Sequence, residues 1–150
     1  MTVAITEADL QFKVYGMPVA QGSKKVIRGH LIEMADARLR SWRQEVAAAA
    51  HNEMKGASPY IEPVSLRLVF WLPRPRGHYG TGRNKDKLKP SAPGFPGVHP
   101  DLDKLCRSVL DAMSHIAFVD DRQVVMLTAS KLYAEGEWRP GLQAGMTVLS

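Results

Sequence analysis

Carboxylates gather at two places in the second half of the chain. Asp101 and Asp103 open one apolar-striped segment, and Asp120 and Asp121 stand side by side just before the next. Hard divalent cations such as Mg²⁺ prefer oxygen ligands of this kind and bind phosphate beside them. Since a short connection joins the two segments, we expect the four carboxylates to be able to converge on one point.

The segment between the acidic positions predicts a helix over about 102–113. Its apolar residues recur at helical spacing, and Asp103, Arg107 and Asp111 lie one turn apart on the opposite face. Acids in a first helical turn also cap the backbone and complement the helix dipole, which is an alternative to a cation site. Cys106 belongs to the apolar stripe as a small core residue. His99 could shuttle a proton, touch DNA or simply be a surface residue.

The excess positive charge lies in one segment rich in Pro and Gly. From Arg74 to Lys89 there are six basic residues and one acid, so this segment carries +5, which equals the net charge of the whole chain. Pro and Gly at this density exclude a helix or a central strand, so we expect a long flexible loop over about 73–99. Such a basic loop could bind a polyanion such as DNA, and the alternative is a solvated loop that touches nothing.

Lys and Arg displace counterions from phosphates, and for this reason basic residues here and near the N-terminus are candidates for DNA binding. They are Arg74, Arg76, Arg83, Lys85, Lys87, Lys89, Lys24 and Lys25. For Lys24 and Lys25, an exposed polar turn is the equal alternative.

Alternating and helical apolar patterns predict the remaining elements. We expect strands over 10–15, 64–72 and about 123–133, a hairpin over 26–32 turning at Gly29, helices over about 36–55 and 102–113, and an edge strand within 146–149. This order predicts a single domain of α+β (mixed α/β) class, with a small mixed sheet flanked by helices.

Composition excludes several classes of protein. The chain has 150 residues, of which 45% are apolar and 23% charged, and this fits one globular domain. No window approaches ~18 consecutive apolar residues, so a membrane span is excluded. The first ten residues lack the pattern of a secretory signal. The single Cys excludes an internal disulfide and a Cys-based zinc site, as expected in a reducing cytoplasm.

The acidic motif resembles the signature of the RusA family of Holliday junction resolvases. The motif consists of Asp101-Leu-Asp-Lys-Leu-Cys-Arg-Ser-Val-Leu-Asp111, followed by Val119-Asp-Asp-Arg-Gln-Val124. The family pattern is similar: it has Asp-x-Asp-Asn, a Lys one turn later, a helix that ends in Leu-Asp, and then Asp-Asp-x-Gln-Val. Val14-Tyr-Gly-Met-Pro-Val-Ala-Gln-Gly-Ser-Lys24 resembles the Gly-x-Pro-x-x-x-Gly opening, and Trp42-Arg43 and Phe70-Trp-Leu-Pro-Arg74 also match. Ser91-Ala-Pro resembles the versions carried by phages and prophages.

The resemblance implies a homodimeric endodeoxyribonuclease that binds four-way DNA junctions. It would nick two opposed strands during recombination and repair, in the cytoplasm of a bacterium or a phage-infected host cell. The resemblance also implies Mg²⁺, with Mn²⁺ able to substitute, held by Asp101, Asp103 and Asp121 and supported by Asp120. Such a cation binds a phosphate oxygen and lowers the pKa of a bound water.

Two positions depart from the family pattern. Arg107 stands where the family has its catalytic Lys, and Lys104 stands where it has Asn. Arg can clamp a phosphate but stays protonated, so any proton exchange would fall to Lys104. The alternative is that Arg107 only forms an ion pair with Asp103 within the helix. At the level of function, the alternatives are a catalytically weakened or inactive branched-DNA-binding protein, and a nuclease for other branched DNA such as flaps or forks.

A junction has two-fold symmetry, and a two-fold homodimer supplies two active sites for it. We expect Val69 and Trp71, on the second face of the 64–72 strand, to form the contact between chains or to lie under a helix.

Overall fold

Four strands form the central sheet of the computed structural model, in the order β1-β6-β4-β5. β6 (Gly141–Val148) runs antiparallel to both β1 (Leu10–Tyr15) and β4 (Val64–Leu72), whereas β5 (Val124–Tyr133) runs parallel to β4. The structure describes residues 8–22, 24–27, 30–33 and 36–150, and the side chains of residues 24–36 lie outside this description. The sheet is mixed, as the sequence predicts.

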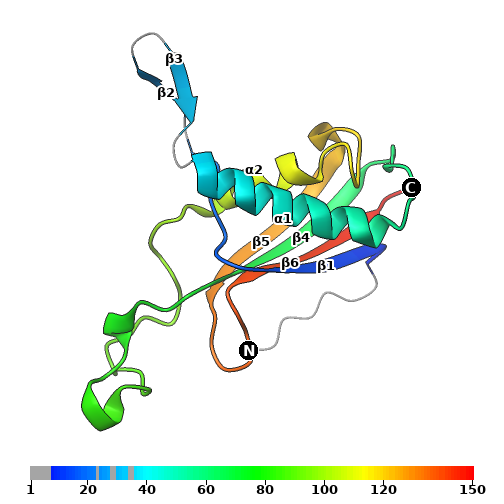
Figure 1. Ribbon diagram of the computed structural model, residues 1–150. Helices are drawn as coiled ribbons and strands as arrows, with labels where there is room; N and C mark the ends of the chain where they lie inside the picture. Colours follow the sequence, from blue (N-terminus) through cyan, green and yellow to red (C-terminus); the bar gives the residue numbers. More distant parts are fainter. Residues whose placement is uncertain (1–7, 23, 28–29, 34–35) are drawn as a thin grey trace.

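Two helices cover one face of the sheet (Figure 1). α1 (Asp36–Met54) packs against β1 and against α2 (Leu102–Met113), which also contacts β5. Alternate strand residues such as Phe12, Leu68 and Phe70 meet Trp42 and Val46 of α1 in the buried core. The molecule is therefore a single α+β domain, and both predicted helices are confirmed.

The predicted hairpin is confirmed as β2 (Lys24–Ile27) paired antiparallel with β3 (His30–Glu33). Gly29, the expected turn residue, lies outside the described residues, as do the side chains of Lys24 and Lys25. Within the described parts of the chain, no helix is long and apolar enough to cross a membrane.

The last strand differs from its prediction. The apolar run at 146–149 predicts an edge strand, but β6 spans Gly141–Val148 and lies between β1 and β4. The start of β6 packs closely on β1, because a Cβ at Gly141 would lie 2.1 Å from the Val14 carbonyl oxygen. Because glycine has no side chain, it interrupts the run of apolar residues. The apolar run therefore does not reveal that this strand begins at residue 141.

The second face of β4 is covered within the chain toward the strand's C-terminal end. Trp71 stacks on Trp138 with ring centroids 4.2 Å apart. Val69 and Trp71 are both buried in the single chain. Neither expected alternative describes Trp71: it is too buried for a contact with a second chain, and Trp138, which covers it, lies in no helix. Val69 is likewise too buried for a contact between chains.

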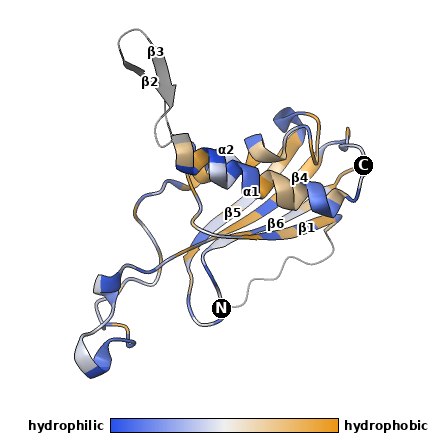
Figure 2. Cartoon of the chain, viewed as in Figure 1, coloured by the Kyte–Doolittle hydropathy of each residue, from blue (hydrophilic) through white to orange (hydrophobic). Residues whose placement is uncertain are grey.

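The basic segment after β4 projects away from the sheet (Figure 1) and folds back on itself. It contains the short turns η1 (Arg76–His78) and η2 (Gly82–Asn84). Gly80 N donates to Lys87 O at 3.0 Å, and Lys89 N donates to His78 O at 2.9 Å. The two turns are hydrophilic (Figure 2), and every residue from Thr81 to Lys89 is exposed.

Candidate functional site

Asp101 stands at the N-terminal end of α2, where its carboxylate makes no capping hydrogen bond to the helix backbone. Its Oδ1 lies 3.0 Å from His99 Nδ1, and its Oδ2 lies 3.4 Å from Lys104 Nζ. Desolvation raises the pKa of Asp101, but the hydrogen bond from Lys104 and the charges of His99 and Lys104 outweigh it and lower the pKa overall. The carboxylate is therefore ionised and half-exposed, and the capping alternative does not account for it.

Two residues, Lys131 and Gln21, hold α2 and the chain that leads into it. Lys131 of β5 donates from Nζ to the carbonyl oxygens of Val98 and Pro100, the second at 2.8 Å. Gln21 donates from its backbone N to Lys104 O at 3.0 Å and from Nε2 to Asp111 Oδ2 at 2.6 Å. Sequence reasoning missed both residues, although Gln21 lies inside the quoted opening motif.

Asp120, the first acid of the Asp120–Asp121 pair, has a structural role. Its side chain accepts a hydrogen bond from Arg122 N at 2.9 Å and caps η3 (Asp121–Gln123). That hydrogen bond is the main cause that lowers the pKa of Asp120. Asp121 follows it and is exposed, so Asp121 is the acid that remains available to a ligand.

Gln123 holds this turn in place. Its Oε1 accepts from Asp120 N at 2.8 Å and from Val119 N at 2.9 Å. Its Nε2 donates to Tyr60 O at 2.8 Å and to Glu62 O at 2.9 Å. Sequence reasoning did not select Gln123, although Asp-x-x-Gln is a signal for a capping box.

A shallow pocket lies beside the Asp120–Asp121 pair. Arg43 of α1 and Asp111 and His115 at the end of α2 line it together with this pair. Arg43 was noted in the sequence as part of a motif but not as a site residue. Its guanidinium gives this acidic pocket one cationic wall.

The structure does not bring the two acidic positions together within one chain. Asp101 precedes the 12 residues of α2 and Asp121 follows them, and a helix of that length extends about 18 Å. Strand β5 leads to the same conclusion. Its residue Lys131 contacts the chain just before Asp101, whereas its first residue, Val124, directly follows η3 and Asp121. The strand from Val124 to Lys131 spans about 23 Å. The expected convergence of four carboxylates does not occur in a single chain.

This separation bears on the expected cation. Carboxylate oxygens have the donor chemistry that Mg²⁺ requires. Among the described residues, however, no three His, Cys, Asp or Glu side chains are close enough to hold a metal ion together. As a set within one chain, Asp101, Asp103 and Asp121 therefore do not fit a cation, and their role as ligands stays a prediction.

Arg107 is an exposed cation on α2, one turn after Asp103. Neither Asp103 nor Asp111 forms an ion pair with it among the ion pairs of the described residues. The intrahelical alternative is thus not observed, and the guanidinium is available to an anion from outside. Lys104, by contrast, is already paired with Asp101.

The predicted DNA-binding residues of the basic segment separate into two groups. Arg74 is used inside the chain: its Nε donates to Glu135 Oε1 at 2.6 Å, its Nη1 donates to Pro93 O at 2.6 Å, and its guanidinium lies over the Tyr133 ring. Arg76 donates to Lys85 O at 2.8 Å and remains exposed. The side chains of Arg83, Lys85, Lys87 and Lys89 are exposed, and this suits them to a polyanion.

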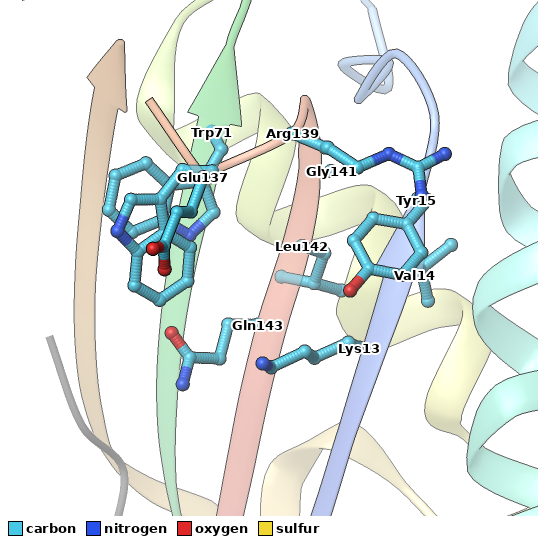
Figure 3. A pocket seen from close by; sticks show the side chains of 10 residues that line it. Lys13, Val14, Tyr15, Trp71, Glu137, Arg139, Gly141, Leu142 and Gln143 are labelled. Carbon is cyan, nitrogen blue, oxygen red and sulfur yellow. The ribbon is translucent and has the colours of Figure 1, made fainter. Parts of the chain in front are cut away.

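A more enclosed pocket lies elsewhere, beside the Trp71–Trp138 stack (Figure 3). Lys13, Tyr15, Glu137 and Arg139 surround it. None of the predicted site residues lines this pocket, so it does not contribute to the acidic site.

Comparison with known proteins assigns the chain to a family. Residues 16–140 match the family described as Endodeoxyribonuclease RusA. The chain is also similar to a protein of Bacillus subtilis (strain 168) named "Uncharacterized protein YqaN", with 34% identity over 128 residues that cover 84% of this chain and 89% of that protein. The matched region contains α2, η3 and the basic segment between β4 and α2. This chain belongs to the RusA endodeoxyribonuclease family.

Proposed function

We propose that this chain is a Mg²⁺-dependent endodeoxyribonuclease that binds four-way DNA junctions. As a homodimer, it cuts two opposed strands during recombination and repair. The observation that carries the proposal is the family match over residues 16–140, within which every acid of the quoted motif is present. A protein that only bound DNA would gain nothing from exposed carboxylates facing phosphate.

The side chains of the chain itself supply phosphate recognition. The guanidinium of Arg107 is planar and permanently charged, so it can bind two phosphate oxygens and stabilise charge that develops on them. It cannot act as a base. The exposed lysines and arginines of the basic segment would hold the arms of a junction through their phosphates.

The cation is supported by donor chemistry and by family membership. Carboxylates select hard divalent cations, and Mn²⁺ accepts the same ligands. Since one chain does not gather these donors, we assign no catalytic step to a cation bound by a single chain.

The test is incubation of the protein with a synthetic four-way junction, with and without Mg²⁺, followed by a denaturing gel. We expect paired nicks at symmetric positions in opposed strands, and an uncut linear duplex of the same sequence. Binding without nicks in Mg²⁺ or Mn²⁺ would contradict nuclease activity and favour a branched-DNA-binding protein. Faster cutting of flaps or forks would contradict junction selectivity.

A further inference from the structure

The pocket in Figure 3 lies over the start of β6, on the face of the sheet opposite α1 and α2. In the strand register, Tyr15 of β1 and Trp71 of β4 both pair with Gly141 of β6. They are therefore two strand spacings apart, about 9.5 Å, and Gly141 places no side chain between them. The register itself thus builds a pocket that has an aromatic side chain on each of two walls.

Trp138 completes the wall formed by Trp71, because the two indoles stack with only 12° between their planes. The pocket has a volume of about 140 Å³. In another protein, an apolar cavity of about 150 Å³ holds one benzene ring. The pocket therefore has room for one planar ring and not for an extended ligand.

Two polar atoms at the pocket have no hydrogen-bond partner among the described residues. Trp71 is only 5% exposed, and its indole Nε1 donates to no acceptor. The Oε1 of Gln143 is also shielded from solvent and accepts from no donor. Both side chains line the pocket, and the carbonyl oxygen of Gln143 lies on the side nearer to the stacked indoles (Figure 3). Buried polar groups are normally paired, so this pocket suits a ring whose edge carries both an acceptor and a donor.

Two cations stand beside the same rings. The guanidinium carbon of Arg139 lies 4.4 Å from the centroid of the Tyr15 ring, and Lys13 Nζ lies 5.6 Å from that of Trp138. Neither cation belongs to an ion pair of the described residues. Glu137 is the one acid that lines the pocket, so the local charge is positive. The pocket therefore favours an aromatic ligand that carries negative charge.

A nucleotide combines these properties. Its base is planar and carries donors and acceptors on its edge, and its phosphate is an anion. Proteins hold single-stranded DNA by this combination, with bases stacked on aromatic side chains beside cations that bind the backbone. The basic segment follows β4 directly, so a strand bound by its lysines and arginines has a short path to the pocket.

We propose that this pocket binds one unpaired nucleotide, with its base between Tyr15 and the stacked indoles and its phosphate against Arg139. The two unpaired polar atoms then bind the edge of the base. The site goes beyond the proposed function, because every base of a four-way junction can pair and none is then free to enter the pocket. It gives the chain a hold on single-stranded DNA that does not depend on the acids of α2.

The first experiment separates the base from the phosphates. Fluorescence anisotropy measures the binding of an end-labelled thymidylate hexamer and of an abasic hexamer that has the same phosphates. A base stacked on an aromatic side chain strengthens binding by roughly tenfold, so we expect the abasic hexamer to bind about tenfold more weakly. Equal affinities for the two hexamers would overturn the proposal.

The second experiment locates the base. Tyr15 is 55% exposed, so Tyr15→Ala should fold normally by circular dichroism and should bind the thymidylate hexamer about tenfold more weakly. Tyr15→Phe keeps the ring and should bind as the native chain does. Met17→Ala is the matched control, since Met17 is 53% exposed just after β1, and it should change nothing. Native affinity in a folded Tyr15→Ala would overturn the position of the base.

The third experiment locates the phosphate through the salt dependence of hexamer binding. Arg139→Gln should lower the slope of log K against log[salt] by roughly 0.7, the value for one contact with a single strand. Arg38→Gln removes the same charge from an exposed position of α1 and should leave the slope unchanged. Equal slopes for the two variants would overturn the position of the phosphate.

The indole N–H resonances give a readout that needs no substitution in the pocket. We expect the resonance of Trp71 to move when the hexamer is added, and that of Trp42, which is buried in the core with α1, to stay in place. A shift with thymidine monophosphate as well would assign the pocket to nucleotides in general, and a shift with the hexamer alone would assign it to a DNA strand. An unmoved Trp71 resonance in both titrations would overturn the site. Because none of these measurements uses cleavage, an inactive native chain would refute the proposed function and leave this test intact.

Discussion

Gln123 and Asp120 hold each other across a single turn. The Oε1 of Gln123 accepts a hydrogen bond from Asp120 N at 2.8 Å, and the carboxylate of Asp120 caps the same turn from its other side. Because the Nε2 of Gln123 is bonded to the carbonyl oxygens of Tyr60 and Glu62, the turn is also attached to the chain that leads into β4. The position of Asp121 therefore depends on an amide that carries no charge.

Gln123→Ala should lower both stability and cleavage. It removes the partner of two backbone N–H groups and two carbonyl oxygens. Two of these contacts, with Asp120 N and Tyr60 O, are partly buried, and leaving buried groups unpaired costs roughly 1–3 kcal/mol. Urea denaturation should show this loss. Gln44→Ala, at an exposed position of α1, is the matched control and should stay within about 0.5 kcal/mol of the native chain. Equal stabilities for the two variants would remove Gln123 from its supporting role.

Asp101→Asn and Asp121→Asn should each abolish junction cleavage while junction binding survives or tightens. Each substitution removes a charged oxygen donor and also one negative charge that repels phosphate. Gel-shift titration measures binding, and a denaturing gel measures cleavage on the same junction. Glu45→Gln, at an exposed position of α1, should leave both unchanged. Full nicking by either Asp variant would exclude that residue from the site.

Arg107→Lys should retain most of the activity, and Arg107→Ala should lose about 10²-fold, the usual effect of removing one group that stabilises developing charge. The side chain acts as a cation in this proposal, so a second cation replaces it. Single-turnover cleavage rates at saturating enzyme make the comparison. If Arg107→Ala cut at the native rate, phosphate would not be bound by this face of α2.

The double substitution Lys85→Gln with Lys87→Gln should weaken junction binding and reduce its salt dependence. Each lost phosphate contact lowers the slope of log K against log[salt] by roughly 0.9. Lys13→Gln with Lys55→Gln removes the same charge from exposed positions outside the basic segment and should leave the slope unchanged. Equal slopes for both pairs would mean that the segment does not bind DNA.

The sequence predicted the elements better than the site they build. Alternation along Leu10–Val14 and 64–72 and the helical stripe of 102–113 are strong signals because one face of each element is buried. Closeness in sequence was misleading for the acids, since the short connection between Asp111 and Asp120 comes after a helix that carries Asp101 about 18 Å away. Charge counting was misleading for Arg74 in a similar way. It cannot distinguish a guanidinium that binds Glu135 from one that is free in solvent.

Cys106 should be unreactive in the folded chain. Burial is the main cause that raises the pKa of its thiol from 9.0 to about 11, and the negative charge of Asp103 adds to the effect. The thiolate is the reactive form, so iodoacetamide at pH 8 should leave the native protein unmodified by mass spectrometry and should modify it fully in urea. Because the pKa is higher in the folded chain than in the unfolded one, the unfolded chain loses the proton first as pH rises. The free energy of unfolding should therefore fall between about pH 9 and 11, and Cys106→Ala should lack this component. Rapid alkylation of the native protein at pH 8 would show instead that the apolar face of α2 opens to solvent, and the packing of α2 against the sheet would have to be revised.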